Sequence, residues 1–241
     1  MMRGLHTPVR AIRRRVFKEV AQLGFKADAD TLLADMEAIP YAIVNEDAEK
    51  YRESVYRARA IVRERLRLAM GLSLRPENKP VHLTAGVEAS NISEKYYEPP
   101  LMQVIPSACE SCEENKYEVS NICKGCLAHP CQEVCPKGAI SMVNGRSYID
   151  QEKCIKCGRC MDVCPYGAIN KLERPCARSC GMDAITSDEL GRAEIDYDKC
   201  VSCGMCLVNC PFGAIVDKGQ IFQTIHAMKS GKEVIAPIAP A

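Results

Sequence analysis

Apolar residues in the first third of the chain recur every three or four positions, which is the period of an amphipathic helix. Thr7 followed by Pro8 is typical of a helix start, because threonine caps the helix and proline suits its first turn. We predict a helix from there to about Leu23, with Gly24 at its end. The stretch "DADTLLADMEAI" predicts a second, short helix closed by Pro40.

A third, longer helix is predicted to be capped by Asn45 or Asp47 and to end near Gly71. Its apolar positions fall at spacings of three and four, so one face is expected to be buried. Those positions are Tyr51, Val55, Ala58, Ile61, Val62, Leu66 and Ala69. Because nothing in the three helices suggests chemistry, residues 1–75 are predicted to form a helical packing or docking domain.

The regular period is lost between residues 76 and 106, so this segment is predicted to be a linker lying over neighbouring surfaces. Its breakers are Pro76, Pro80, Gly86, Pro99, Pro100 and Pro106. Near the other end of the chain, "GQIFQTIHAM" predicts a short helix ending near Gly231, and "KEVIAPIAPA" begins like a strand. We expect residues 219–241 to be an exit segment toward a catalytic domain that is missing from this chain or is a separate subunit.

The sequence between these regions repeats at an offset of 45 or 46 residues. "AISMVNGRSYIDQEKC" corresponds to "AITSDELGRAEIDYDKC", and each reads as two short strands joined by a turn. The predicted fold class is therefore α+β, with a helical N-terminal segment followed by two tandem units at 107–170 and 171–218. Units this small bury little apolar surface, and aromatic residues make up only 5% of the chain, so metal centres are expected to supply much of the folding free energy.

Sixteen cysteines imply either a disulfide scaffold or metal ligation. The N-terminus lacks the apolar run of a secretory signal, and "RRRVF" is followed by polar residues, so export is not expected. We expect a cytoplasmic, reducing and anaerobic setting in which the thiolates bind metal. No apolar stretch is long enough to span a membrane.

The net charge of +1 gives no reason to expect a nucleic-acid partner. The charge is uneven, however, because residues 1–75 carry 15 Lys and Arg against 10 Asp and Glu. The excess is either a set of solvated helix faces or a docking face for an acidic partner or domain.

Two cysteine runs identify the metal chemistry. C154-IK-C-GR-C-MDV-C-P and C200-VS-C-GM-C-LVN-C-P both match C-x2-C-x2-C-x3-C-P, the pattern of bacterial two-cluster ferredoxins. Three closely spaced thiolates wrap one [4Fe-4S] cube, and the fourth cysteine reaches a second cube. Tetrahedral zinc sites use pairs of cysteines rather than four at this density.

C123-KG-C-LAHP-C-QEV-C-P is a related run with a widened second gap, whereas Cys176 and Cys180 have no pair immediately before them. Only Cys109 and Cys112 remain to complete the set, about 65 residues upstream of Cys176. We therefore predict four [4Fe-4S] clusters and no separate catalytic residue. The four ligand sets are Cys123, Cys126, Cys131 and Cys164; Cys135, Cys154, Cys157 and Cys160; Cys109, Cys112, Cys176 and Cys210; and Cys180, Cys200, Cys203 and Cys206.

Two alternatives remain open. His129 lies in the widened gap and is either a ligand or a structural histidine. The pairs Cys109/Cys112 and Cys123/Cys126 also have zinc-ribbon or rubredoxin spacing, which would give a protein with one structural zinc site and three clusters. That arrangement would leave the other four cysteines to meet across two units.

Residues 100–241 resemble the accessory-cluster region of monomeric [FeFe] hydrogenases. The resemblance rests on "CESCEENKYEVSNICKGC", "RPCARSCGMDAI", the two ferredoxin runs and "KEVIAPIAPA". It implies an electron-transfer relay that works with a ferredoxin-like redox partner protein and a catalytic domain or subunit. In that family further cysteines hold the catalytic cluster, and none follows Cys210 here, so hydrogen chemistry by this chain alone is not expected. The alternative is the four-cluster electron-transfer subunit of another multisubunit oxidoreductase.

Overall fold

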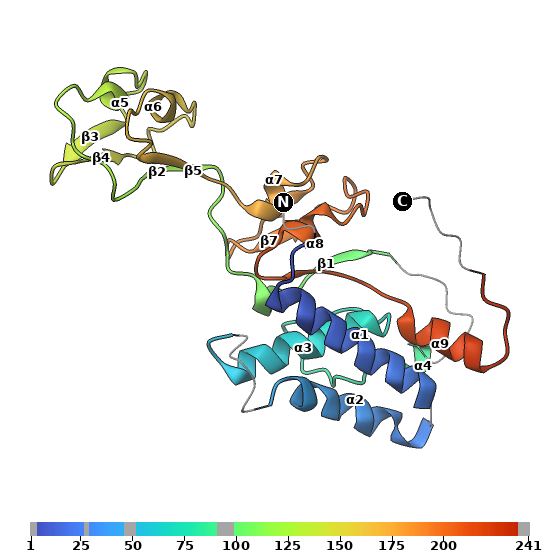
Figure 1. The fold of residues 1–241 in the computed structure, drawn as a ribbon. Helices are drawn as coiled ribbons and strands as arrows, with labels where there is room; N and C mark the ends of the chain where they lie inside the picture. The colour runs from blue at the N-terminus through green and yellow to red at the C-terminus, as the bar shows by residue number, and fades with distance from the viewer. Residues whose placement is uncertain (1–3, 27–28, 46–51, 91–98, 236–241) are drawn as a thin grey trace.

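The computed structural model describes residues 4–26, 29–45, 52–90 and 99–235. Figure 1 shows three bodies in space: a layer of helices, a cysteine-rich unit packed on it, and a second cysteine-rich unit that projects away. The helices are α1 (Pro8–Lys26), α2 (Ala29–Ile43), α3 (Val55–Ala69), α4 (Val87–Ser90), α5 (Pro130–Glu133), α6 (Arg159–Asp162), α7 (Pro175–Arg178), α8 (Met205–Asn209) and α9 (Ile221–Lys229), with a 3-10 turn at Pro106–Ala108. The strands are β1 (Met102–Val104), β2 (Lys116–Val119), β3 (Ile140–Val143), β4 (Arg146–Ile149), β5 (Ile169–Leu172), β6 (Ile185–Ser187), β7 (Ala193–Ile195) and β8 (Ile215–Asp217).

Helices α1, α2, α3 and α9 form the helical domain around one apolar core. Val20, Met36, Leu66 and Phe222, one from each helix, are fully buried in that core. In Figure 1, α9 lies along α1, although about 200 residues separate them in the sequence. The predicted helix at the end of the chain is therefore part of this domain, and it stays a prediction that residues 219–241 lead toward a catalytic domain or subunit.

Close packing also explains why Gly24 does not end the first helix. It lies inside α1, and a Cβ at this position would be only 3.0 Å from two side-chain carbons of Ile225. Glycine is used here for the close approach of α9 rather than for a left-handed helix end. The helix continues to Lys26.

Pro40 does not close the second helix. Its carbonyl accepts a hydrogen bond from the Val44 amide at 3.0 Å, and α2 runs through it to Ile43. Ile39, Ile43 and Val44 are all buried in the domain core. Burial of these side chains thus favours the last helical turn more than the proline disfavours it.

The third helix begins later than predicted, at Val55, with Ser54 as its cap. The Ser54 hydroxyl accepts from the Arg57 amide at 3.5 Å, whereas Asn45 lies before a gap in the described residues, and Asp47 and Tyr51 lie outside them. The predicted buried face is confirmed for Ala58, Ile61, Val62, Leu66 and Ala69. The strand expected from "KEVIAPIAPA" is not seen in residues 232–235, and its remaining residues lie outside the described part of the chain.

The cysteine-rich unit next to the helices is built from two separated segments, residues 101–112 and 174–217, and we call it the proximal unit. Strand β1 pairs antiparallel with β8, with Met102 opposite Asp217, and β6 pairs with β7. Met102, Ile185, Ile195 and Ile215 meet in its small core.

Residues 113–173 form the projecting unit, which we call the distal unit. Its strands repeat the same plan: β2 pairs with β5, and β3 pairs with β4. Tyr117, Ile140, Ile149 and Ile169 form a core that shares no residue with that of the proximal unit.

The three bodies are therefore nested rather than arranged in tandem. The chain leaves the helical domain, builds β1, builds the whole distal unit, returns to complete the proximal unit, and ends in α9 (Figure 1). This differs from the predicted division in two ways. The predicted linker, 76–106, contains α4 and β1, and residues 107–112 belong to the proximal unit instead of the distal one.

Arginines of the basic helical domain attach it to the proximal unit. Arg13 forms an ion pair with Asp217 at 2.9 Å, and Arg52 donates to the carbonyl of Phe212 at 2.6 Å. Arg65, which is 2% exposed, donates to the carbonyl of Gly213. Of the two explanations for the excess positive charge, docking on another domain accounts for these side chains.

Candidate metal centres

Each of the four C-x-x-C pairs has the same backbone turn. The residue before its second cysteine has a positive φ: 46° at Ser111, 56° at Gly125, 60° at Lys156 and 56° at Ser202. Three of these four residues are not glycine, although side chains disfavour this conformation. The pair at Cys109 and Cys112 therefore has the local geometry of the three pairs that begin recognisable ferredoxin runs.

The next cysteine of each set lies on a short helix. Cys131, Cys160, Cys176 and Cys206 belong to α5, α6, α7 and α8, and all four are between 6% and 8% exposed. The cysteine four residues further on leaves the helix and begins a turn into a strand. This is the local structure that the orphaned pair Cys176 and Cys180 shares with the complete runs.

The last cysteine of every run accepts a hydrogen bond from the backbone four residues later. The Ala139, Ala168, Ala184 and Ala214 amides donate to the sulfurs of Cys135, Cys164, Cys180 and Cys210 at 3.3–3.4 Å. A positive-φ residue precedes each alanine and aims the amide: Gly138, Gly167, Asp183 and Gly213. Amide donors of this kind stabilise negative charge on sulfur.

Three groups of four cysteines line three small cavities. In the distal unit one cavity is lined by Cys123, Cys126, Cys131 and Cys164, and another by Cys135, Cys154, Cys157 and Cys160. In the proximal unit a third is lined by Cys180, Cys200, Cys203 and Cys206. Each group is one of the predicted ligand sets.

The fourth group consists of Cys109, Cys112, Cys176 and Cys210. Three of them pack together in the core of the proximal unit. Burial raises the pKa of the Cys112 thiol, and the neighbouring sulfurs of Cys109 and Cys210 raise it further. The structure therefore brings the remote pair to the cysteines that lacked partners.

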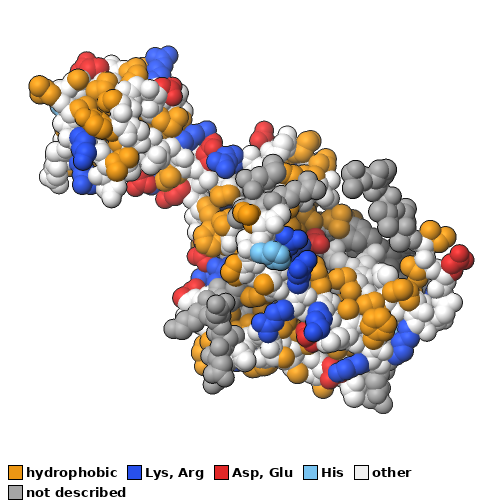
Figure 2. All heavy atoms as spheres, in the orientation of Figure 1, with side chains coloured by type: hydrophobic (Ala, Val, Ile, Leu, Met, Phe, Trp, Pro, Cys, Tyr) orange, Lys and Arg blue, Asp and Glu red, His pale blue; other side chains and the backbone are white. Residues whose placement is uncertain are grey.

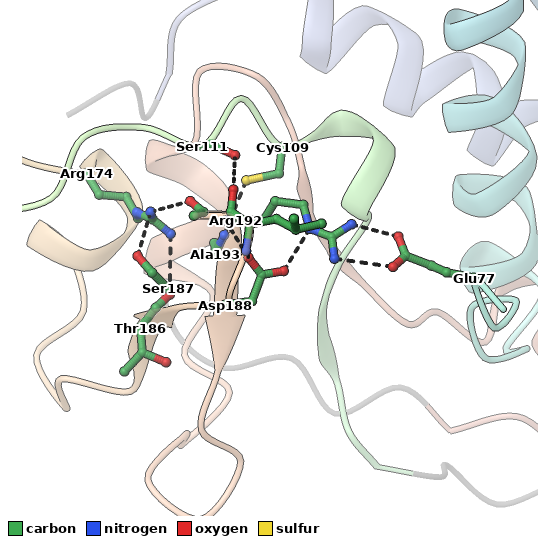
Figure 3. Close-up of polar contacts among 11 residues, drawn as sticks. Glu77, Cys109, Ser111, Arg174, Thr186, Ser187, Asp188, Arg192 and Ala193 are labelled. Carbon is green, nitrogen blue, oxygen red and sulfur yellow. Dashed lines mark hydrogen bonds and ion pairs between the residues drawn. The ribbon is translucent and has the colours of Figure 1, made fainter.

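Contacts with the β6–β7 hairpin hold the remote pair in place (Figure 3). The Ala193 amide donates to the sulfur of Cys109 at 3.3 Å, and the Ser111 hydroxyl donates to the carbonyl of Leu190 at 3.2 Å. Arg174, which is 3% exposed, donates to the carbonyl of Cys112 at 3.0 Å.

Arg174 also connects the two segments that cross between the units. It is the residue just before α7, where the chain returns from the distal unit, and it donates to the carbonyl of Gly191 at 2.7 Å and the hydroxyl of Ser187 at 2.9 Å. Sequence reasoning missed this residue, because a single arginine before "PCARSC" carries no signal of its role.

Several of the thiols are strongly shifted toward the protonated form. Burial raises the pKa of Cys176 to about 12 and that of Cys206 to about 11. In the opposite direction, a hydrogen bond from the Ser147 backbone lowers the pKa of Cys123. Metal binding requires thiolates, so loading the buried positions releases protons.

The alternative zinc set is not brought together. Cys123 and Cys126 line a cavity of the distal unit, whereas Cys109 and Cys112 belong to the proximal unit. His129 is the residue before α5 and is not among the residues lining that cavity. Within the described ranges, no three His, Cys, Asp or Glu side chains converge closely enough to ligate a single metal ion.

A separate cavity of about 470 Å³ is lined by no cysteine. It lies between α3 and residues 74–82, where the Glu64 carboxylate already accepts from the Arg75 guanidinium at 2.6 Å. We assign it no role in metal binding. None of the helices in the described ranges is long and apolar enough to cross a membrane.

Comparisons with known proteins agree with the cysteine geometry. Two models of a 4Fe-4S binding domain match residues 147–170 and 192–215. The chain is 32% identical over 110 residues to an uncharacterized ferredoxin of Methanocaldococcus jannaschii, a match that covers 36% of this chain and 70% of that protein.

A second similarity is to the electron transport protein HydN of Escherichia coli, at 36% identity over 62 residues. This match covers 26% of the chain and 35% of HydN, so it spans only about a third of that relative. With the cysteine loops, the amide–sulfur bonds and the matched domains together, the chain belongs to the ferredoxin family of iron–sulfur electron-transfer proteins with 4Fe-4S binding domains.

Proposed function

We propose that this chain is an electron relay that holds four [4Fe-4S] clusters, one in each group of four cysteines. The observation that carries the proposal is the division of all sixteen thiols into four groups, with no cysteine left over. The residues fit such clusters, because each group supplies four sulfurs and one or two of them also accept a backbone amide. When bound, a cluster of this type accepts and releases one electron at a time.

The short helices place neighbouring groups close to each other. Cys131 and Cys135 are four residues apart yet line different cavities, and the same is true of Cys160 and Cys164. Two ligand groups of one unit are therefore joined by a step of only four residues along the backbone. In the proposed relay, the positions of these cysteines set the separation of the two clusters of each unit.

Metal and sulfide analysis tests this proposal. Protein assembled without oxygen should contain about sixteen iron and sixteen sulfide per chain, as four cubes require. About twelve iron with one zinc would instead support the zinc alternative at Cys109 and Cys112. A value near eight would mean that only one unit binds clusters.

We also propose where the relay delivers its electrons. The resemblance of "RPCARSCGMDAI" and its partners to accessory regions of [FeFe] hydrogenases favours a hydrogenase catalytic domain or subunit. The alternative is the electron-transfer subunit of another multisubunit oxidoreductase. A reducing, cytoplasmic setting belongs to either version, because sixteen free thiols must stay available for iron.

An experiment with hydrogen gas distinguishes a hydrogenase from another oxidoreductase as the destination of the electrons. With an [FeFe] hydrogenase catalytic domain added, hydrogen gas should bleach the visible absorption of the clusters, and without that domain it should not. Equal bleaching without the added domain would contradict the assignment of catalysis to another domain or subunit. Failure to bleach at any concentration of that domain would favour the other oxidoreductases.

A further inference from the structure

The internal repeat allows the surfaces above two corresponding cavities to be compared. In the distal unit, two exposed cations, Lys137 and Arg159, line the cavity of Cys135, Cys154, Cys157 and Cys160. A third exposed cation, Lys156, stands in the chain between the lining residues Ile155 and Cys157. Ile155 lies among them with 55% of its surface exposed, and the side chain of Cys157 is also exposed to solvent. We call this surface the distal mouth.

The three corresponding positions of the proximal unit carry no cation, and an exposed carboxylate, Asp183, stands where the distal unit has Gly138. At the offset of the repeat, Met182 replaces Lys137, Ser202 replaces Lys156, and Met205 replaces Arg159. The exposed apolar residue is kept, as Val201 in place of Ile155. The cluster-binding loop therefore does not require cations at these positions, and their presence in one unit needs a different explanation.

The three cations also have no ion-pair partner in the part of the chain that the structure describes. Three other lysines of the distal unit are paired: Lys116 with Glu113 at 3.3 Å, Lys153 with Asp150 at 3.2 Å, and Lys171 with Glu173. Within the described residues, none of the distal-mouth cations forms an ion pair. Their charge is available to a molecule outside the chain.

The position of the distal mouth suits a transient protein partner. The distal unit projects from the rest of the molecule, and basic and apolar side chains lie side by side on its surface (Figures 1 and 2). The fourth cysteine group, by contrast, lies where the helical domain packs on the proximal unit, with Cys109 and Cys210 against buried Ile61 and Leu68. A charged rim around an apolar centre speeds association and orients the partner, and does not require a large buried area.

We propose that the distal mouth is the docking surface for an acidic electron-carrier protein, one whose redox centre lies near its surface among carboxylates. This inference rests on the proposed relay function and specifies where the relay meets its soluble partner. The carboxylates face Lys137, Lys156 and Arg159, and the apolar contact with Ile155 brings the two redox centres together next to Cys157.

Charge reversal of the loaded full-length chain tests the proposal. The variant combines Lys137→Glu, Lys156→Glu and Arg159→Glu, and the probe is a reduced acidic [2Fe-2S] ferredoxin mixed in a stopped-flow instrument. At low ionic strength we expect the second-order rate constant to fall at least about tenfold, and its decrease with added salt to disappear. The matched control is Lys116→Glu, Lys153→Glu and Lys171→Glu, which changes the charge of the same unit equally at residues that line neither cysteine cavity and should cost less than about twofold.

Two further measurements keep failure of the docking proposal distinct from failure of the relay. Iron content checks that the clusters remain, and reduced methyl viologen, which needs no docking surface, should reduce both variants as fast as the parent chain. Equal losses in the two triple variants would overturn the proposal, because they would show a general effect of net charge. An unchanged rate in the distal-mouth variant, or loss instead on Met182→Glu with Val201→Glu, would overturn it as well.

Discussion

Replacing Cys109 and Cys112 with serine is expected to remove one [4Fe-4S] cluster of the four, about four iron per chain. Replacing Cys176 and Cys210 with serine should remove the same cluster, since either change leaves one cube with two thiolates. Combining all four substitutions should cost no additional iron. The physical reason is the shared site, in which the Ala193 amide, Arg174 and Ser111 fix the remote pair against the β6–β7 hairpin.

Iron analysis combined with EPR spin counting on the three variants decides this prediction. Cys180→Ser is a useful control, because Cys180 lies just beyond the end of α7 and lines the cavity with Cys200, Cys203 and Cys206. It should change a different EPR signal. Loss of two clusters in the quadruple variant, or of different clusters in the two double variants, would show that the four thiols do not share a site.

The cysteine grouping could be reached from the sequence because ferredoxin spacing leaves few choices. Three of the sets follow from runs whose fourth cysteine crosses to the neighbouring cluster, and the last set follows because Cys109 and Cys112 are the only thiols left. The structure places the same four sulfurs together in each case, although ligation itself stays a prediction.

The nested connection could not be predicted in the same way. Strand β1 has only three residues, "MQV", and its alternation is too short to stand out from the proline-rich stretch before it. Its pairing with β8 joins positions more than a hundred residues apart, and such long-range contacts leave no local pattern. The repeat can be recognised in the sequence, and it suggests tandem units. The strand that completes the proximal unit, β1, comes before the distal unit in the chain and lies outside the repeated stretch.

The predicted ends of the first two helices are wrong for a related reason. Gly24 and Pro40 are strong local signals for the end of a helix, and both lie inside helices here. Packing of α9 on α1 and burial of Ile43 and Val44 outweigh local preferences of a few kcal/mol or less. Tertiary contacts of this kind cannot be anticipated while the position of α9 is unknown.

Removing the distal unit should leave a folded protein with two clusters. In this variant residues 113–173 are replaced by four glycine and serine residues, which reach roughly 13 Å when extended. That length is sufficient because the side chain of Arg174 already spans the gap, with its donor 3.0 Å from the carbonyl of Cys112. We expect about eight iron per chain, because both cysteine groups of the proximal unit remain complete. Residues 113–173 expressed alone should also bind about eight iron, since their sheets and apolar core are their own.

A second deletion of similar length distinguishes nesting from a tandem order. Removing residues 107–170 cuts at the boundary that tandem units would have, and it takes Cys109 and Cys112 away with the distal unit. Nesting then predicts about four iron per chain, held by Cys180, Cys200, Cys203 and Cys206, with Cys176 and Cys210 left without partners. Loss of the pair also removes contacts of the β6–β7 hairpin, so this variant should unfold at lower denaturant concentration than the first, measured by circular dichroism. Equal iron and equal stability in the two deletions would contradict the nested arrangement, because residues 107–112 would then supply neither ligands nor contacts to the proximal unit.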